Sequence, residues 1–320
     1  MEPLLLDFLK VTESAALAAR QWVGRGDKIA ADEIATKTMR KHLNRINMKG
    51  EIVIGEGEID DAPMLHIGEV LGFGEDPELD IAVDPIEGTT PTANGQDNAM
   101  TVIAAAPKGN LLHAPDMYME KMAVGADAKG KINIGASIIE NLQAVAKAKG
   151  KTVDELNVLI QDRPRHKETI DEIRQSGAKV HLFKDGDVIY AISTCIKRVD
   201  MDLFLGIGGA PEGVLGAIGV KGLGGEMQAK LKPRNNQETE RCKDMGLTIP
   251  EKTLNHEDLV KSDHCMLIAT GITNNPFLRG IESDHEHQTT HSLLIGGKAQ
   301  QLRYVETQYP MVKEAYARVD

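Results

Sequence analysis

From about residue 131 onward, short apolar runs alternate with amphipathic segments, and this alternation constrains the fold more than any other feature. The segment SIIENLQAVAKAKG carries Ile138, Leu142 and Val145 at helical spacing, and the apolar run LNVLI follows it. The same order continues through HKETIDEIRQSG, AKVHLF, DVIYAISTC, MDLFLGI and EGVLGAIGVKGL. Because strands that alternate with helices build parallel βαβ units, the sequence predicts an α/β fold.

Three polar loops follow predicted strands of this region, at residues 161–166, 184–187 and 206–213. In open α/β sheets, ligands bind beyond the carboxyl ends of the strands. The alternative for the arginines of the first loop is that they are surface charges that open the next helix. We expect the charged side chains of the three loops to face one cleft: Arg163, Arg165, Asp185, Asp187 and Glu212.

The chain is predicted to begin with two helices. One runs from Asp7 to about Trp22, and the other follows Asp27-Lys28. The polar stretch 232–256 is expected to be irregular with one short helix, and IATGIT and SLLIGG are expected to add strands. The second helix has apolar residues four apart on one face, at Ala31, Ala35, Met39 and Leu43.

Two predicted strands of the N-terminal part end in carboxylates. EIVIGEGEID runs from a strand into a loop that carries Glu56, Glu58, Asp60 and Asp61. LDIAVDPIEG is a second strand, which Pro85 is expected to end because proline cannot donate a ladder hydrogen bond. Crowded carboxylates repel one another unless water or cations separate them, and all-oxygen sites suit Mg²⁺ and Mn²⁺. The alternative for EGEIDD alone is a solvated acidic loop.

The hexapeptide Asp84-Pro85-Ile86-Glu87-Gly88-Thr89 is the most informative motif. Asp84 and Glu87 are three residues apart and can share a metal cluster. The backbone N–H groups after Gly88 can bind an anion, and the Thr89 hydroxyl can hold an attacking water. The alternative is a chance turn built from the same residue types.

Other motifs are weaker or do not occur. Asp32 is expected in the first turn of the second helix, where an acid usually complements the helix dipole, and Lys28 is expected to be a solvated surface lysine. Gly206-x-Gly208 is followed by Pro211 where a dinucleotide fingerprint needs its third glycine. The sequence contains no GK[ST], HExxH or GxSxG motif.

The overall charge argues against nucleic acid as a partner. The chain has 48 acidic and 37 basic residues, a formal net charge of −11, and 3% aromatic residues to stack on bases. Its three cysteines have no metal-site or redox spacing, and the start MEPLLLDFLK does not resemble a signal peptide. We therefore expect a cytoplasmic protein without a membrane segment. A phosphorylated substrate would require metal ions or a few placed Lys and Arg residues to reverse the acidic excess locally.

The chain resembles the bacterial class II fructose-1,6-bisphosphatases in six segments, which occur in the family's order and spacing: IVIGEGEIDDAPML, IAVDPIEGT, HAPDMYMEK, RPRH, DGD and GIGGAPEGV. These enzymes belong to the lithium-sensitive phosphatase superfamily, which shares an Asp-Pro-x-Asp/Glu-Gly-Thr turn. The similarity extends from Val11 to about Arg303. It implies a layered α/β/α/β/α sandwich with two intimately packed halves. We place a soft boundary near residue 130, between an N-terminal metal-binding half (1–130) and a C-terminal βαβ substrate-binding half (131–320).

The resemblance also implies two or more Mn²⁺ or Mg²⁺ ions and a set of site residues. The implied metal ligands are Asp32, Glu56, Asp84, Glu87 and Glu212, and Thr89, Asp84 and Glu56 are the implied catalytic residues. The implied substrate contacts are Glu87, Gly88, Thr89, Tyr118, Arg163, Pro164, Arg165, Asp185, Gly186, Asp187 and Gly209.

Three positions depart from the family pattern and bear on substrate preference and metal number. Thr90-Pro91-Thr92 stands where relatives often carry a bulkier or basic residue, His66 where tyrosine is common, and Glu33 where glycine is usual.

By this resemblance, the reaction is hydrolysis of the 1-phosphate of fructose 1,6-bisphosphate to fructose 6-phosphate, a step of gluconeogenesis, in a homo-oligomer (dimer or tetramer). Arg163 and Arg165 are the best candidates to bind the remote phosphate, because Pro164 stiffens the loop between them. One alternative is a phosphatase for sedoheptulose 1,7-bisphosphate, alone or in addition. Another is a catalytically silent sugar-phosphate sensor, against which intact Asp84, Glu87 and Thr89 argue.

Overall fold

The computed structural model describes residues 2–55, 64–247, 252–296 and 301–311. A short 3₁₀ turn leads into α1 (Leu5–Arg20), and α2 (Lys28–Leu43) follows. The Asp27 side chain caps α2 by accepting a 2.9 Å hydrogen bond from the Ala30 N–H. The presence of α1 and α2 confirms the two predicted N-terminal helices. All four residues of the predicted apolar face of α2 are fully buried.

The first sheet is mixed and eight-stranded, and its strands come from both ends of the chain. Its order is β11-β12-β10-β4-β3-β1-β2, and β13 pairs with β12. β1 and β3 are parallel, whereas the other pairs are antiparallel. The strands are β1 (Lys49–Ile54), β2 (Val70–Leu71), β3 (Glu78–Glu87), β4 (Met100–Pro107), β10 (Met266–Gly271), β11 (Glu282–Ser283), β12 (His287–Gly296) and β13 (Gln301–Pro310).

The second sheet has five strands in the order β7-β6-β8-β5-β9. The predicted parallel arrangement is confirmed for β6 (Asn157–Gln161), β7 (Lys179–Phe183) and β8 (Leu203–Gly209). β5 (Tyr118–Val124) and β9 (Glu226–Leu231) add antiparallel strands that the sequence did not predict. Each carries a polar residue among its buried positions, Lys121 in β5 and Gln228 in β9, which obscures the alternation of apolar and polar residues.

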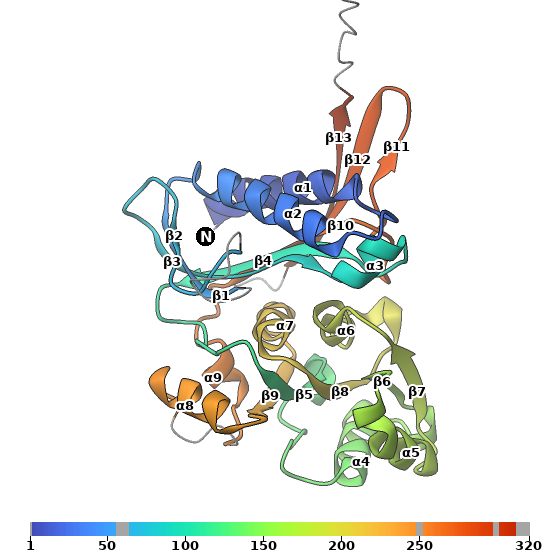
Figure 1. Cartoon of the computed structure of the whole chain (residues 1–320). Coiled ribbons are helices and arrows are strands. Elements are labelled where there is room, and N and C mark those ends of the chain that lie inside the picture. The colour runs from blue at the N-terminus through green and yellow to red at the C-terminus, as the bar shows by residue number, and fades with distance from the viewer. Residues whose placement is uncertain (1, 56–63, 248–251, 297–300, 312–320) are drawn as a thin grey trace, which may run out of the picture.

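Helices and sheets stack in five layers, which confirms the predicted α/β sandwich (Figure 1). α1 and α2 cover the outer face of the first sheet. α6 (Asp187–Ser193) and α7 (Ala210–Gly222) lie between the sheets, and α4 (Ile138–Lys149) and α5 (Lys167–Gln175) cover the second sheet. α7 is buried around its whole circumference, as expected for a helix with a sheet on either side.

Apolar cores separate the layers. Along β4, Ile103 packs in the core beneath α1 and α2, while Val102 packs in the core between the two sheets. This alternation follows from the opposite directions of successive side chains in a strand. A third core, which includes Leu142 of α4 and Val158 of β6, fills the space between the second sheet and its outer helices.

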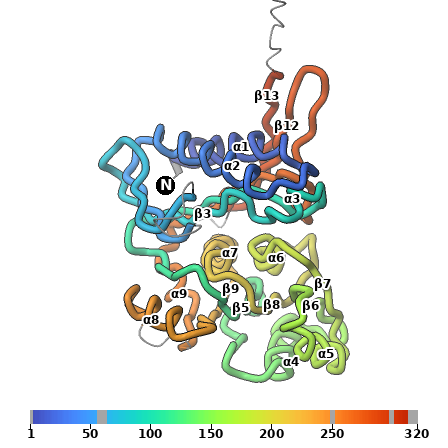
Figure 2. The backbone as a smooth tube through the Cα atoms, in the orientation of Figure 1, coloured from blue at the N-terminus to red at the C-terminus, as the bar shows by residue number. Residues whose placement is uncertain are grey.

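The chain path crosses between the sheets twice. It enters the second sheet through the segment between β4 and β5, and it returns to the first sheet at β10, after α8 (Asn236–Asp244) and α9 (His256–Leu259) (Figure 2). The division near residue 130 stays a prediction. Within the described residues, no helix combines the length and apolar character needed to cross a bilayer.

Candidate active site

The parallel pairing of β1 and β3 brings the ends of both strands to the same edge of the first sheet. The prediction that Pro85 ends its strand is wrong, because β3 continues to Glu87. The register passes from Asp84 opposite Val102 to Glu87 opposite Met100, so one extra residue forms a bulge. Pro85 lies in this bulge, where no ladder hydrogen bond is required of it.

A short helix, α3 (Thr89–Asn94), begins directly after Gly88. Gly88 has φ of 94°, and a Cβ there would lie 2.5 Å from the Asn98 carbonyl oxygen, so only glycine fits this turn. The start of a helix leaves its first N–H groups without acceptors inside the helix. Such N–H groups at Thr89 and Thr90 suit an anion, and the binding of one there stays a prediction.

The loops of the second sheet meet this turn across the gap between the sheets. β6 and β7 end at Gln161 and Phe183, and Gly186, with φ of 105°, precedes α6. The expected loop at 206–213 does not exist, because β8 runs to Gly209 and α7 starts at Ala210. The Val188 N–H of α6 donates a 2.9 Å hydrogen bond to Glu87 Oε1, which joins α6 to the first sheet.

One cleft of about 340 Å³ collects most of the predicted site residues. The prediction that Arg163, Arg165, Asp185, Asp187 and Glu212 share a cleft is confirmed. The turn of the first sheet supplies the opposite wall. The further predicted residues along the cleft are Asp84, Glu87, Gly88, Thr89, Tyr118, Gly186 and Gly209, whereas Asp32 and Pro164 are not among its lining residues.

A buried lysine that the sequence did not single out lies beneath the cleft. Lys121 is 1% exposed, and its Nζ forms an ion pair with Asp187 and donates a 3.0 Å hydrogen bond to the Gly209 carbonyl. A Cβ on Gly208 would lie 2.9 Å from this Nζ, so the glycine-rich end of β8 makes room for the ammonium group. The signal for Lys121 was a charged residue within the apolar run YMEKMAV.

The basic side of the cleft is formed by Arg163 and Arg165, which follow β6, and Arg165 contacts β8. Arg163 pairs with Asp185 at 2.9 Å, whereas Arg165 donates from Nε and Nη2 to the Ile207 carbonyl at 2.8 and 2.6 Å. His166 is buried, and its Nε2 accepts a 2.8 Å hydrogen bond from the Ile207 N–H. Its Nδ1 therefore carries the proton and donates to the Gln161 carbonyl at 2.8 Å. Burial lowers the pKa of His166, which keeps the ring neutral and this arrangement intact.

Tyr118 links the cleft to α8. The guanidinium carbons of Arg165 and Arg234 each lie 5.0 Å from the centre of its ring. Arg234 Nε also donates a 2.7 Å hydrogen bond to Glu238 of α8. Sequence reasoning missed Arg234 because it lies in the polar stretch 232–256, which has no periodicity to place it.

Comparisons with known proteins identify the family of the chain. The profile of the family described as bacterial fructose-1,6-bisphosphatase, glpX-encoded, matches residues 2–309. The chain belongs to this family. It is 46% identical over 317 residues to the fructose-1,6-bisphosphatase class 2 of Haemophilus influenzae, covering 95% of each chain. It is 47% identical over 317 residues to fructose-1,6-bisphosphatase 1 class 2 of Escherichia coli K12, covering 95% of this chain and 94% of the relative.

A third relative adds a second substrate to its name. It is the D-fructose 1,6-bisphosphatase class 2/sedoheptulose 1,7-bisphosphatase of Trichodesmium erythraeum. It is 41% identical to this chain over 326 residues, and the match covers 94% of each protein. Membership in the class II fructose-1,6-bisphosphatases makes this chain a phosphoric monoester hydrolase. We therefore set aside the alternative of a catalytically silent sensor.

The metal ions expected for a class II fructose-1,6-bisphosphatase find suitable donors in the cleft. Glu87 Oε2 and Glu212 Oε2 are buried and have no hydrogen-bond partner among the described residues. Burial, together with the nearby carboxylates of Glu212 and Asp187, raises the pKa of Glu87 to about 8, although the hydrogen bond from Val188 opposes this shift. Burial also raises the pKa of Glu212. These carboxylates are costly to ionise without a cation, and an all-oxygen set suits Mg²⁺ or Mn²⁺.

The ligand set itself stays a prediction. Glu56, Glu58, Asp60 and Asp61 lie outside the described residues, and no three His, Cys, Asp or Glu side chains within the described ranges form a ready metal site. The placement of Asp32 in the first turn of α2 is wrong, because the helix begins at Lys28 and places Asp32 one turn further along.

Lys28 and two residues that depart from the family pattern make local polar contacts. Lys28 is exposed as expected, but its Nζ donates a 2.7 Å hydrogen bond to Thr90 Oγ1 in the first turn of α3. Two of the residues that depart from the family pattern have local charged neighbours: Glu33 forms an ion pair with Lys37, and His66 Nδ1 lies 3.5 Å from Glu69 Oε2.

Proposed function

We propose that this enzyme hydrolyses the 1-phosphate of fructose 1,6-bisphosphate in the cleft between its two sheets, with divalent cations as cofactors. One observation carries the proposal: a single cleft is lined at once by the carboxylates of the Gly88 turn and by the guanidinium groups of Arg163 and Arg165. A bisphosphate needs both, a polar centre for the phosphate that reacts and a cationic partner for the phosphate that does not.

The acidic side of the cleft would bind the reacting phosphate. We assign Asp84, Glu87 and Glu212 as ligands of Mn²⁺ or Mg²⁺, together with Asp32 and Glu56 from the family resemblance. Bound there, two or more such ions would offset the charge of the carboxylates and of the phosphoryl group. The N–H groups that open α3 add hydrogen-bond donors on the same side.

Thr89 would position the attacking water. It is the first residue of α3 and lies in the cleft between Gly88 and Thr90. Its hydroxyl is too weak a base to act alone, so we assign proton acceptance to a neighbouring carboxylate. The rigid Gly88 turn would hold the hydroxyl in place, and errors of about 1 Å in such positioning can cost roughly a hundredfold in rate.

The cationic side would bind the remote phosphate. Arg165 is the stronger candidate, because its hydrogen bonds in the structure go to neutral acceptors, the Ile207 carbonyl and Gln161 Oε1. Arg163 would have to leave Asp185 to bind a phosphate. The ring of Tyr118 and the glycine-rich segments at Gly186 and Gly209 complete the lining where the sugar would lie.

Sedoheptulose 1,7-bisphosphate is a second candidate substrate, because the name of the Trichodesmium relative includes it. The two sugars differ by one carbon between their phosphates. A panel of fructose 1,6-bisphosphate, sedoheptulose 1,7-bisphosphate and fructose 1-phosphate, assayed with Mn²⁺, tests the proposal. We expect the bisphosphates to be used well and the monophosphate poorly. Equal use of all three would contradict a site for a remote phosphate.

The family resemblance supports three broader proposals: a role in gluconeogenesis, a cytoplasmic location and a homo-oligomeric state. Light scattering of the purified protein tests the last of these, for which we expect a dimer or tetramer.

A further inference from the structure

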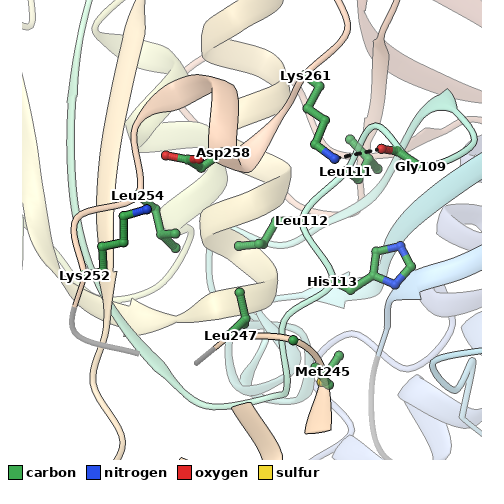
Figure 3. A pocket seen from close by; sticks show the side chains of 11 residues that line it. Gly109, Leu111, Leu112, His113, Met245, Leu247, Lys252, Leu254, Asp258 and Lys261 are labelled. Carbon is green, nitrogen blue, oxygen red and sulfur yellow. Dashed lines mark hydrogen bonds between the residues drawn. The ribbon is translucent and has the colours of Figure 1, made fainter. Parts of the chain in front are cut away.

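A second hollow, apart from the catalytic cleft, lies between the end of α8 and the segment that follows β4 (Figure 3). Its volume is about 520 Å³, compared with about 340 Å³ for the catalytic cleft. We call it the Leu112 pocket. It is defined by Leu112, His113, Leu247, Lys252, Leu254 and Lys261.

The Leu112 pocket combines an apolar interior with a cationic edge. Leu112 and Leu247 point toward each other across the hollow, and Leu254 extends the apolar surface (Figure 3). Lys252 and Lys261 are exposed at its edge. The Lys261 ammonium group donates to a neutral acceptor, the Gly109 carbonyl, at 3.2 Å.

The lining also contains one acidic residue, Asp258, which forms no observed ion pair with Lys252 or Lys261. The Asp258 carboxylate instead accepts a 2.8 Å hydrogen bond from the Asn255 N–H and so caps α9. The lining therefore carries two lysines and one aspartate over an apolar floor, in a chain of net charge −11. It matches a small molecule that has an apolar or planar body and an anionic group.

Both walls of the Leu112 pocket lead to Met117, the residue that precedes Tyr118 of the catalytic cleft. On one side, the chain runs directly from His113 to Met117. On the other side, Leu247 follows α8, whose Cys242 Sγ lies 3.3 Å from Met117 Sδ. The Met117 carbonyl in turn accepts a 2.8 Å hydrogen bond from the N–H of Ala210, the first residue of α7.

The other end of α8 also reaches the cleft. Glu238, in the first turn of α8, accepts a hydrogen bond from Arg234, whose guanidinium lies over the ring of Tyr118. A shift of α8 relative to the 109–117 segment would therefore act on Tyr118 from two sides, through Met117 and through Arg234.

We propose that the Leu112 pocket is a second binding site, which takes a small organic anion with an apolar body and which biases substrate affinity through Met117 and Tyr118. The ligand inserts its body between Leu112 and Leu247 and directs its anionic group to the edge of the pocket, where Lys252 and Lys261 add positive charge. Because it would bridge the 109–113 segment and the end of α8, it fixes the relative position of the two walls.

Two probes with nearly the same body test the ligand class. The dye 8-anilinonaphthalene-1-sulfonate has a sulfonate, and N-phenyl-1-naphthylamine lacks it. Fluorescence titration of the folded wild-type enzyme is expected to show saturable binding of the sulfonate dye, at least three times tighter than the neutral one. Equal affinity for the two dyes would overturn the assignment of an anionic ligand.

Variants then locate the site. Leu247→Trp fills the pocket and should weaken binding of the sulfonate dye at least tenfold. Lys252→Gln/Lys261→Gln should weaken it three- to tenfold, more at low salt, and leave the neutral dye unchanged. Lys179→Gln, an exposed lysine on β7, is the matched control and should change neither affinity. Unchanged binding of the sulfonate dye by both the Leu247 variant and the double lysine variant would overturn the site.

The coupling to the cleft rests on the proposed function and has its own measurement. With the sulfonate dye at saturation, KM for fructose 1,6-bisphosphate should change at least twofold in the wild-type enzyme and stay constant in Leu247→Trp. A constant KM in the wild-type enzyme would overturn the coupling. The dye titrations do not depend on turnover, so a failure of the proposed reaction would be seen separately, as no phosphate release without the dye.

Discussion

The backbone N–H of Val188 donates a 2.9 Å hydrogen bond to Oε1 of Glu87, so one carboxylate connects the first sheet to the first turn of α6. The other oxygen, Oε2, is buried without a hydrogen-bond partner among the described residues. We infer that Glu87 has two functions, to hold α6 against the first sheet and to offer a free oxygen to a cation. The two functions can be separated by substitution.

Glu87→Gln keeps an oxygen for Val188 and removes the negative charge. We expect kcat/KM for fructose 1,6-bisphosphate to fall at least about a hundredfold, while the midpoint of thermal unfolding stays within a few degrees of wild type. Glu87→Ala is the matched control, because it also leaves the Val188 N–H unpaired, at a cost of about 1–3 kcal/mol in the free energy of unfolding. Wild-type turnover by Glu87→Gln would show that the charge is not needed.

Thr89 offers a test of water positioning. Thr89→Ala removes the hydroxyl and should reduce kcat by at least about a hundredfold, with little change in KM, because the loss falls on the transition state. Thr89→Ser keeps the hydroxyl and should retain a larger part of the rate. Equal activity of the two variants would show that Thr89 serves only to open α3.

Arg165 should discriminate a bisphosphate from a monophosphate. A charge-assisted hydrogen bond contributes about 1.5–3 kcal/mol, so Arg165→Ala should reduce kcat/KM for fructose 1,6-bisphosphate by roughly ten- to a hundredfold. Fructose 1-phosphate, which lacks the remote phosphate, should be affected little. Equal losses on the two substrates would mean that Arg165 supports the fold or contacts the reacting phosphate.

Much of the fold could be predicted from periodicity. The alternation after residue 131 located β6, β7 and β8 and their helices, since each of these elements has one clear apolar pattern. β5 and β9 were missed because Lys121 and Gln228 are buried where apolar residues are expected. Both polar side chains have hydrogen-bond partners that are distant in sequence, Asp187 for Lys121 and Ile132 for Gln228.

The sequence predicted which residues line the cleft, but not the contacts that these residues make. The carboxyl ends of parallel strands placed Arg165 and Asp185 together without reference to any family. The contact of Arg234 with Tyr118 could not be foreseen, because it depends on how the irregular segment before α8 folds back on β5. The bulge at Pro85 could not be predicted either, because it depends on the register between β3 and β4.

His256 should make stability depend on pH. The Met227 N–H donates to its Nδ1 at 2.8 Å, and its Nε2–H donates to the Ala217 carbonyl at 2.9 Å, so both ring nitrogens are occupied in the neutral form. Burial lowers the pKa of His256 to about 4. The unfolded chain binds this proton near pH 6.5, so the contribution is fully present above pH 6.5 and is lost as pH falls toward 4.

The expected loss is about 3 kcal/mol in the free energy of unfolding between pH 6.5 and pH 4. Denaturant unfolding of the metal-free enzyme at a series of pH values measures it. His256→Gln has no proton to gain in this range and should give a flatter curve. Parallel curves for the two proteins would contradict a neutral, buried His256.

The most direct test of metal-dependent hydrolysis in this cleft is phosphate release from fructose 1,6-bisphosphate by enzyme stripped with a chelator, before and after addition of Mn²⁺. Asp84→Asn is assayed beside the wild type, because it removes one carboxylate charge at nearly constant size. We predict that only the wild type with Mn²⁺ releases phosphate and forms fructose 6-phosphate. Turnover by the stripped enzyme, or full turnover by Asp84→Asn at saturating Mn²⁺, would contradict the proposed site.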